Sequence, residues 1–187
     1  MVNNRDRVFL RGLEIDDHVK LYQWRQNEDV FQYYRSAIRY ISTLNEKNWV
    51  ENRITDKENV TCAICLKETN EFIGCTFLNN IDLINRSARG GTFIGDSEYQ
   101  GKGYGTEARI LILRHAFFDW GLERVWAHIH LSNVASIRMH EKCGYVKEGI
   151  LRNASFINGR FEDLQLMAVL KEDFVSLFKS IGSLSAK

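Results

Sequence analysis

The hydrophobic positions of the chain repeat with two periods, and these periods divide it into strands and helices. Alternating apolar and polar residues, rich in β-branched side chains, predict strands at 8–13, 60–66, 71–84, 87–95, 124–131, 145–157 and 160–170. Apolar residues three and four apart predict a helix that starts near Asp16 and further helices at 43–54, 105–120, 133–142 and 172–181. The resulting order, β-α-α-β-β-β-α-β-α-β-β-α, predicts an α+β (three-layer α/β) domain with a mixed, mostly antiparallel sheet of about seven strands and helices on both faces.

Local signals support two of these boundaries. Thr43 and Glu46 match a capping box at the start of the helix at 43–54. Asn158 and Gly159 separate the last two strands, and this dipeptide is a strong signal for a two-residue hairpin turn.

The stretch 94–108, IGDSEYQGKGYGTEA, places three glycines at alternate positions between a strand and a helix. The first turn of a helix has N–H groups with no intrahelical partner, and the helix dipole adds partial positive charge there. Gly101, Gly103 and Gly105 keep side chains out of the approach and permit a positive φ. This arrangement predicts a binding site for an anion, most often a phosphate.

Three phosphate-binding motifs compete for this stretch. A P-loop requires G-x-x-x-x-G-K-[ST], which the glycine spacing and the residue after Lys102 exclude. A dinucleotide fingerprint requires a third glycine where Thr106 stands, and an acidic residue at the end of the next strand, where none occurs. The third motif, Q-x-x-G-x-G, is matched by Gln100, Gly103 and Gly105.

Composition and charge narrow the range of partners. The 187 residues have the length of one domain, which we take as 1–187 with a core at about 8–170 and a C-terminal helix and tail at 171–187. The formal net charge of +1 provides no global basic field for nucleic acid. Because the chain has no apolar run that could span a membrane and no signal peptide, we expect no membrane contact and a cytoplasmic location. The four cysteines lack zinc-site spacing, so we expect no metal.

A second group of polar residues lies on the helix expected at 133–142, which Asn133 is expected to cap. Asn133, Ser136, Ile137 and His140 stand at i, i+3, i+4 and i+7, so they form one stripe along the helix. The stripe is about 10 Å long at a rise of about 1.5 Å per residue. Beside a phosphate-binding turn, such a stripe can line the arm of a long cofactor.

The loop and this helix together resemble the GNAT superfamily of N-acetyltransferases, from about Leu10 to Leu170. The string 98–105, EYQGKGYG, is close to the acyl-CoA pyrophosphate loop of that family. The chain is similar to the branch that holds the ribosomal-protein N-terminal and the spermidine acetyltransferases. The residues that carry this similarity are Leu10, Arg11, Leu13, Glu14, Asn133, Ser136, Glu141, Lys142, Cys143, Gly144, Tyr145, Glu148, Gly149, Asn158, Gly159, Arg160, Phe161 and Asp163.

The resemblance implies the GNAT fold and acetyl-CoA as the co-substrate, without a metal. In the family, acetyl-CoA lies in a V between two strands, which correspond here to 91–95 and 125–130. The residues implied to bind it are Phe93, Ile94, Gln100, Gly101, Lys102, Gly103, Tyr104, Gly105, Thr106, Asn133 and Ser136. The acceptor enters from the opposite side. It is a small-molecule amine or a protein N-terminus, and we expect a monomer or homodimer.

Two residues are candidates for the acid that protonates the leaving thiolate. Many GNAT enzymes place a Tyr seven residues after the asparagine of this helix, where this chain has His140. An imidazole with an ordinary pKa near 6.5 can donate a proton, so this substitution is chemically feasible. Ser136 matches a serine proposed as the acid in some ribosomal-protein acetyltransferases. As alternatives, His140 packs on its helix and Ser136 bonds to the backbone.

The sequence offers several candidates for the base that removes a proton from the amine. Relatives often carry Glu at the positions of Gly90 or Ser155, so this chain departs from the family there. The remaining candidates are Asp96, Glu98, His128 and His130. The last two share one face of their strand and could pass a proton through water, but they could equally be ordinary strand residues. Catalysis by positioning alone is a further alternative.

The acceptor side of relatives corresponds here to Trp24, Arg25, Phe31, Tyr33 and Tyr34, which could hold a cation but which we expect to cover core. The favoured function is an N-acetyltransferase that transfers acetyl from acetyl-CoA to a protein N-terminus, a polyamine or an amino sugar. One alternative is an acyl-CoA-binding sensor with little or no catalysis, which the missing Glu residues favour. Another is a nucleotide-binding redox domain, which the broken fingerprint disfavours.

Overall fold

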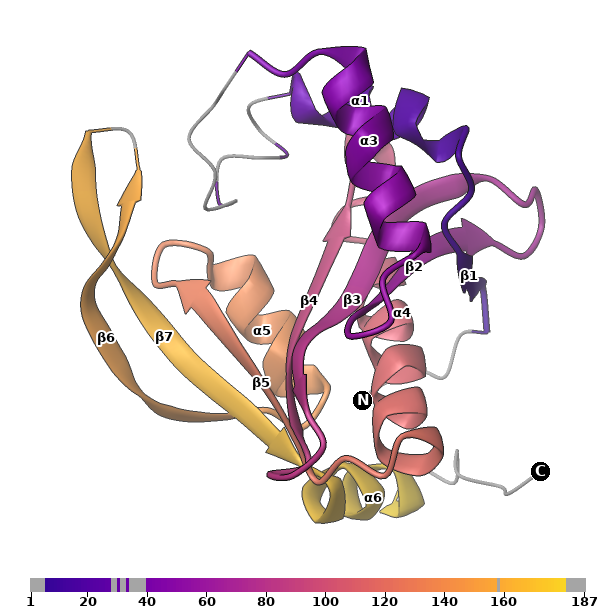
Figure 1. Cartoon of the computed structure of the whole chain (residues 1–187). Coiled ribbons are helices and arrows are strands. Elements are labelled where there is room, and N and C mark those ends of the chain that lie inside the picture. The colour runs from indigo at the N-terminus through magenta and orange to yellow at the C-terminus, as the bar shows by residue number, and fades with distance from the viewer. Residues whose placement is uncertain (1–5, 28–29, 31–32, 34–39, 158, 181–187) are drawn as a thin grey trace.

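The computed structural model describes residues 6–27, 30, 33, 40–157 and 159–180 (Figure 1). Its strands are β1 (Val8–Gly12), β2 (Val60–Leu66), β3 (Phe72–Asp82), β4 (Ser87–Ile94), β5 (Arg124–His130), β6 (Val146–Ile157) and β7 (Arg160–Leu170). Its helices are α1 (Asp17–Arg25), α3 (Thr43–Ile54), η1 (Ser97–Tyr99), α4 (Tyr104–Arg114), η2 (His115–Asp119), α5 (Val134–Lys142) and α6 (Lys171–Ser180). The strands lie where the sequence predicts them, with ends that differ by at most about two residues.

The strands form one seven-stranded sheet in the order β1-β2-β3-β4-β5-β7-β6. All neighbouring pairs are antiparallel except β4 and β5, so the predicted mixed, mostly antiparallel sheet is confirmed. The parallel ladder between β4 and β5 has three residue pairs, 87–89 with 124–126. Beyond this ladder the two strands diverge, and the sheet opens into a V (Figure 1).

Two hydrophobic cores lie on opposite faces of the sheet. On one face, α1 and α3 pack against β2 and β3 around Trp24. On the other face, α4 and η2 cover the sheet, with Phe117 and Ala108 fully buried. Because successive residues of a strand point to opposite faces, Ile64 packs with Ala108 while Cys65 packs in the core around Trp24.

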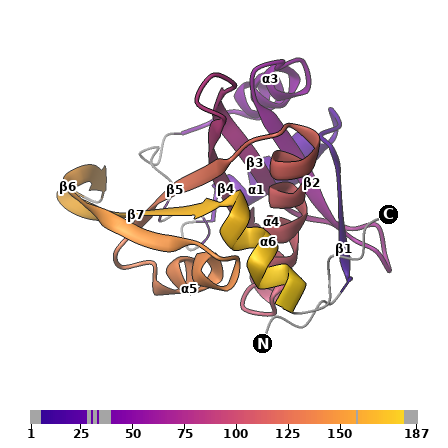
Figure 2. The ribbon, with the colours of Figure 1, turned by 90° about the horizontal axis from the view of Figure 1, so that it is seen from below.

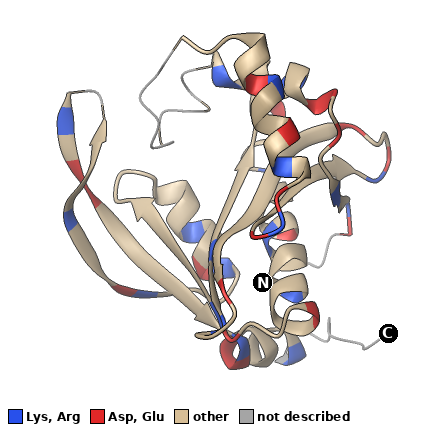
Figure 3. Cartoon of the chain, viewed as in Figure 1, with Lys and Arg blue, Asp and Glu red and all other residues tan. Residues whose placement is uncertain are grey.

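The remaining elements lie around these two cores. The β6–β7 hairpin extends away from the rest of the sheet, with α5 beside it (Figure 2). Lys, Arg, Asp and Glu side chains are mixed along the ribbon, in keeping with the small net charge (Figure 3). The predicted turn residue Asn158 lies outside the described residues, and Gly159 next to it has a φ of +78°.

The start of α3 differs from the predicted capping box. The N-cap is Ser42, whose Oγ accepts a hydrogen bond from the N–H of Asn45 at 3.1 Å. Glu46 is buried and forms an ion pair with Arg25 of α1, so its carboxylate does not reach the helix start. Burial raises the pKa of Glu46, and the nearby Arg25 opposes this shift. The predicted box is wrong because this tertiary ion pair takes the carboxylate that a local cap would need.

Two glycines of β4 make close contacts instead of forming a bulge. A Cβ atom at Gly91 would lie 1.9 Å from the ring of Phe77, and one at Gly90 would lie 2.4 Å from Nη1 of Arg109. The register between β3 and β4 is regular through both positions. Glycines inside a strand mark either a bulge or the close approach of other groups, and these two mark a close approach.

Gly74 allows β3 to approach β4 beside the glycine loop. A Cβ atom there would lie 2.2 Å from the carbonyl oxygen of Phe93, which belongs to a paired strand and cannot move freely. We expect Gly74→Ala to lower the free energy of unfolding by about 2 kcal/mol, as measured by urea denaturation. Gly149→Ala is the control, because no atom lies within 4 Å of its added methyl group. It should change the value by less than about 0.5 kcal/mol, and equal stability of the two variants would contradict the tight approach.

Candidate active site

The glycine loop joins β4 to α4 and leaves the start of α4 open. Gly101 and Gly103 have φ values of +71° and +92°, which a side chain would strain. Gly103 is the N-cap of α4, and no side chain in the described part of the chain caps this helix. Nε2 of Gln100 donates to the carbonyl of Ile94 at 3.0 Å and ties the loop to the end of β4. The first N–H groups of α4 are therefore in the arrangement that a phosphate group requires.

Arg7 holds this loop from the N-terminal side. Its Nη2 donates to the carbonyl oxygen of Lys102 at 2.9 Å, and its Nε donates to Glu107 of α4 at 2.9 Å. The guanidinium carbon lies 4.2 Å from the centroid of the Tyr104 ring. No sequence motif marks Arg7. It meets the loop, about 95 residues later in the chain, only because β1 packs against α4.

A groove of about 500 Å³ runs from the glycine loop along α5. It is lined by all of the residues expected to bind acetyl-CoA except Lys102 and Tyr104. Lys102 is exposed on the loop, and Tyr104 packs edge to face against Tyr99 at 5.9 Å between ring centroids. Arg138, which no sequence motif marks, and Lys142, named above only for the family resemblance, also line the groove from successive turns of α5. Their charges suit the phosphates of CoA.

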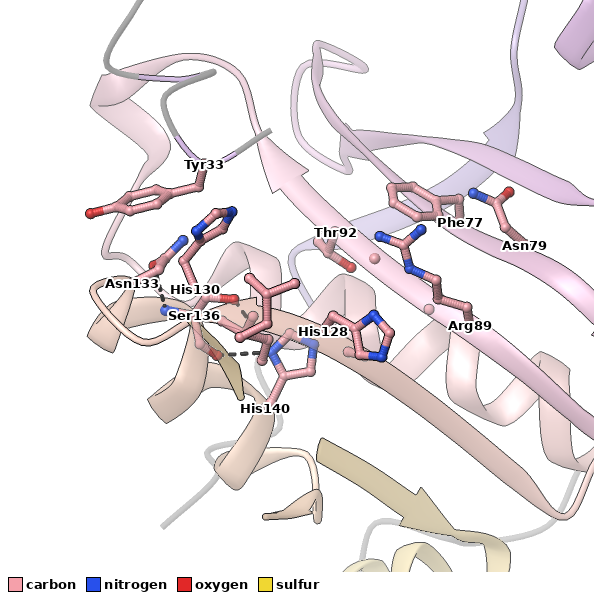
Figure 4. A pocket seen from close by; sticks show the side chains of 15 residues that line it. Tyr33, Phe77, Asn79, Arg89, Thr92, His128, His130, Asn133, Ser136 and His140 are labelled. Atoms are coloured by element: carbon pink, nitrogen blue, oxygen red, sulfur yellow. Dashed lines mark hydrogen bonds between the residues drawn. The ribbon is translucent and has the colours of Figure 1, made fainter. Parts of the chain in front are cut away.

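A second cavity of about 350 Å³ lies between the diverging strands β4 and β5, and we call it the chamber. Its lining residues are Tyr33, Phe77, Asn79, Arg89, Gly90, Gly91, Thr92, Ala127, His128, Ile129, His130, Asn133, Ser136, His140 and Leu164. Tyr33, His130 and Asn133 lie toward one end, and Phe77, Asn79 and Arg89 toward the other (Figure 4). The groove and the chamber share Tyr33, Thr92, Asn133 and Ser136, so they meet at the start of α5.

The ladder between β4 and β5 ends at Arg89 of β4. Beyond this point, a ligand with amide groups, such as the arm of CoA, can lie along the β5 side of β4 and bond to its backbone. The loop, the groove and the strand edge all fit acetyl-CoA.

The start of α5 positions the two candidate acids. Oδ1 of Asn133 accepts a hydrogen bond from the N–H of Ser136 at 3.0 Å, so Asn133 is the N-cap that the sequence predicts. One turn later, Nδ1 of His140 donates to the carbonyl oxygen of Ser136 at 2.8 Å. The Oγ of Ser136 lies 3.5 Å from the same ring nitrogen (Figure 4). Both side chains line the chamber.

His140 is held neutral by its surroundings. Its side chain is 3% exposed, and Nη2 of Arg109 lies 3.4 Å from its Nε2. Burial and the charge of Arg109 lower the pKa of His140 to about 3. With Nδ1 donating to a carbonyl and Nε2 facing a cation, the ring has no proton directed to the chamber. This geometry disfavours His140 as the acid and favours Ser136.

Arg109 gives a physical reason for Gly90, where the chain departs from its family. The guanidinium is fully buried and lies directly behind Gly90, so even a methyl group at this position would collide with it. The guanidinium carbon also lies 5.9 Å from the ring centroid of Tyr145. No sequence motif marks Arg109, since it stands among apolar residues of α4 that predict only a buried helix.

The structure separates the candidates for the base. Asp96 accepts a hydrogen bond from Nε1 of Trp24 at 2.9 Å and pairs with Lys20 at 3.1 Å. Glu98 is exposed on η1, away from the chamber lining. His128 and His130 both line the chamber from β5.

The residues expected on the acceptor side lie in different parts of the structure. Trp24 is a core residue, as expected, and Arg25 pairs with Glu46. Tyr33 lines both cavities, although we expected it to cover core. The predictions for Phe31 and Tyr34 fall on residues outside the described part of the chain.

The groove begins at an open helix start and leads to a chamber between diverging strands. This arrangement is typical of the class of acyl-CoA-dependent transferases. The family model described as "Acetyltransferase (GNAT) domain" matches residues 7–146, and the chain belongs to this family. The probable N-acetyltransferase YjcK of Bacillus subtilis is 32% identical over 89% of this chain and 95% of that protein. The spermidine N(1)-acetyltransferase of Vibrio cholerae is 29% identical over 91% of this chain and 96% of that protein.

A solved structure agrees with these relatives. The crystal structure of the spermidine N-acetyltransferase from Vibrio cholerae in complex with CoA and spermine matches with a TM-score of 0.84 and 26% identity. The match covers 91% of this chain and 99% of that chain. The GNAT fold and an acetyl-CoA-dependent N-acetyltransferase, both predicted from the sequence, are thus confirmed. These relatives are named as enzymes and give no support to the sensor alternative.

The described residues contain neither a metal-binding cluster nor a membrane-spanning helix. No cluster of three or more His, Cys, Asp or Glu side chains in that part of the chain could hold a metal ion. No helix found there combines the length and the apolar character needed to cross a membrane.

The glycine loop yields a test with a matched control. Gly103→Ala forces a side chain into a left-handed conformation at the start of α4, so the loop must rearrange. We expect the dissociation constant of CoA to rise at least about tenfold, as measured by isothermal titration calorimetry. Gly121→Ala introduces comparable strain at a φ of +65° in another turn and should leave CoA affinity unchanged. Unaltered affinity in the Gly103 variant, with lowered thermal stability in both, would show that the loop does not bind CoA.

The neutral state of His140 predicts a pH-dependent stability. Folding lowers the pKa of His140 from 6.5 to about 3. Between these two pH values, the imidazole is therefore protonated in the unfolded chain but neutral in the folded one. Stability therefore falls as the pH drops below 6.5, by about 2 kcal/mol between pH 7 and pH 5 from this group alone.

The test compares urea denaturation of wild type and His140→Gln at the two pH values. The variant should lose about 2 kcal/mol less than wild type on acidification, because glutamine does not titrate. If His140→Gln shows the same difference between the two pH values as wild type, His140 is not held neutral by the fold.

Proposed function

We propose that the chain transfers the acetyl group of acetyl-CoA to a primary amine that enters the chamber and attacks the thioester directly. The observation that carries this proposal is the junction of the groove and the chamber at Thr92, Asn133 and Ser136. With its phosphates at the glycine loop and its arm along the groove, acetyl-CoA would present its thioester at this junction. The amine then reaches the carbonyl carbon from the chamber side. We expect this activity in the cytoplasm, from a monomer or a homodimer.

We assign the protonation of the leaving thiolate to Ser136. Its hydroxyl lies at the junction of the two cavities, and its backbone N–H is already satisfied by Asn133. The neutral ring of His140 supports this role by fixing the carbonyl of Ser136 through Nδ1. The buried charge of Arg109, behind Gly90 in the chamber wall, adds a positive potential that favours the developing thiolate.

Two observations bear on the acceptor. The relatives named spermidine N(1)-acetyltransferases support a polyamine. The described residues that line the chamber include no carboxylate, which supports an acceptor with a single ammonium group, such as an amino sugar or a protein N-terminus.

The deciding experiment offers the protein isotopically labelled acetyl-CoA and a panel of amines. The panel contains spermidine, peptides with ribosomal-protein N-termini, aminoglycosides and amino-sugar nucleotides, and mass spectrometry identifies labelled products. A labelled amine establishes the acceptor class. Bound acetyl-CoA without a labelled product from any of these amines would favour the sensor function instead.

Ser136→Ala tests the assigned acid. The helix cap should survive, because Asn133 bonds to the backbone of Ser136 and not to its side chain. We expect kcat to fall about 100-fold with little change in the dissociation constant of CoA, as measured by steady-state kinetics and calorimetry. Ser176→Ala, on the exposed side of α6, is the control and should retain wild-type kcat. A kcat within about threefold of wild type would remove Ser136 from the proton transfer.

A further inference from the structure

His130 is a buried histidine at the end of β5, and one of its nitrogens is fully paired. Its side chain is 4% exposed, and its Nδ1 lies 3.0 Å from Oε2 of Glu162 on β7. Its Nε2 is buried and has no hydrogen-bond partner among the described residues. The ring lines the chamber, with the ring of Tyr33 at 6.0 Å between centroids (Figure 4).

The other residues around Glu162 hold its carboxylate in place. Nε and Nη2 of Arg160 donate to Oε1 at 3.1 and 2.9 Å, and the hydroxyl of Ser132 lies 3.5 Å from Oε2. Hydrogen bonds from His130 and Arg160 lower the pKa of Glu162, so the carboxylate is charged at neutral pH. A charged carboxylate can only accept a hydrogen bond, so Nδ1 carries the hydrogen and donates it to Oε2 of Glu162. This fixes the tautomer of His130 and leaves the lone pair of Nε2 as an acceptor on the chamber side.

We propose that His130, oriented by Glu162, is the general base that takes the proton from the acceptor ammonium group in the chamber. This assignment rests on the proposed function, because it presumes that an amine is the acceptor. His130 is then a catalytic residue, and Glu162 is a positioning residue that acts through it. Neither role follows from a family motif in the sequence.

The alternatives in the chamber are weaker. The described lining contains no carboxylate, and its histidines are the side chains suited to take a proton near neutral pH. Of these three histidines, His140 has both ring nitrogens engaged by Ser136 and Arg109. His130 is the one whose Nδ1 faces a carboxylate, and this contact leaves Nε2 as the nitrogen that can accept a proton. Gly90 and Ser155 stand where relatives carry Glu, and the Glu162–His130 pair restores a base to the same chamber.

The proton balance of the reaction is complete with these groups. His130 takes one proton from the ammonium through Nε2, and the free amine forms a C–N bond to the thioester carbonyl carbon. Collapse of the tetrahedral intermediate breaks the C–S bond. The thiolate takes the hydroxyl proton of Ser136, which recovers a proton from the amine nitrogen. The first proton leaves from His130 to solvent, so each turnover yields an amide, CoA thiol and one proton.

The groups that affect the titration of His130 come from several elements. Glu162, with Arg160 behind it, acts from β7, and Tyr33 acts from the segment that follows α1. The other titratable or charged residues described around the chamber are Arg89, His128 and His140. His140 is neutral across the working range, so it does not produce a limb in a pH profile near neutrality.

The kinetic test measures kcat/KM against pH for the panel amine that gives most labelled product. We expect His130→Gln to lower kcat/KM at neutral pH about 100-fold. The rate should recover at high pH, where solution supplies the free amine. Glu162→Gln removes the charge and offers Nδ1 an amide N–H as well as an oxygen, so the ring can direct its hydrogen toward the chamber, and kcat/KM should fall about tenfold. CoA affinity should stay at the wild-type value in both variants, and His115→Gln should retain the wild-type profile. A His130→Gln profile within about threefold of wild type at every pH overturns the proposal.

A second measurement separates this inference from the proposed function. The chain has 5 histidines, so the ring protons of His130 can be assigned in NMR spectra by comparison with His130→Gln. The ring nitrogen shifts should place the hydrogen on Nδ1 in wild type and on a mixture of Nδ1 and Nε2 in Glu162→Gln, where the amide can also donate. If wild type acetylates no amine, the proposed function fails, and the base assignment falls with it. The tautomer still decides whether the pair exists, and the same tautomer in both proteins overturns the pair even in an active enzyme.

Discussion

The parallel ladder of three residue pairs between β4 and β5 is the constraint on which the site depends. A parallel connection requires a crossover, and here α4 provides it, with its open start at the glycine loop. If the two strands paired along their full length, the chamber would close and β4 would have no free edge. Because the ladder stops at Arg89, two cavities can meet between the strands. Gly74 and Gly91 allow the close packing of β3 on the other side, so the divergence occurs toward β5 alone.

One positive charge, the guanidinium of Arg109, is buried beside this opening. Arg109 is buried behind Gly90, and its Nε and Nη1 have no hydrogen-bond partner among the described residues. A buried cation of this kind costs free energy unless the site uses it. The proposed transfer creates negative charge first on the carbonyl oxygen and then on sulfur, and Arg109 lies behind the chamber wall that these atoms would face. The cost of burying the guanidinium is therefore consistent with stabilisation of the transition state.

Sequence patterns predicted the parts of this structure that depend on local chemistry. The strands, the glycine loop and the Asn133 cap could be predicted from the sequence, because backbone geometry dictates the residue types at these positions. Arg7, Arg109 and Glu162 could not be found in this way. Each acts on a residue distant in sequence, and an isolated charged residue has no pattern until the fold supplies its partner. The same reason explains the capping-box error, since Glu46 pairs with Arg25 across two helices.

The proposed base and the proposed acid lie close together in the sequence, and this arrangement constrains the proposed mechanism. His130 ends β5, Asn133 caps α5 and Ser136 lies in its first turn, so one short segment carries all three. Glu162 fixes one end of this segment from β7, and the ring of His140 fixes the other from within α5. A change at either anchor would alter the separation of the two proton-transfer groups without touching the substrate. Since rates depend steeply on such placement, the Glu162 and His140 contacts are as much part of the site as the residues that meet the substrate.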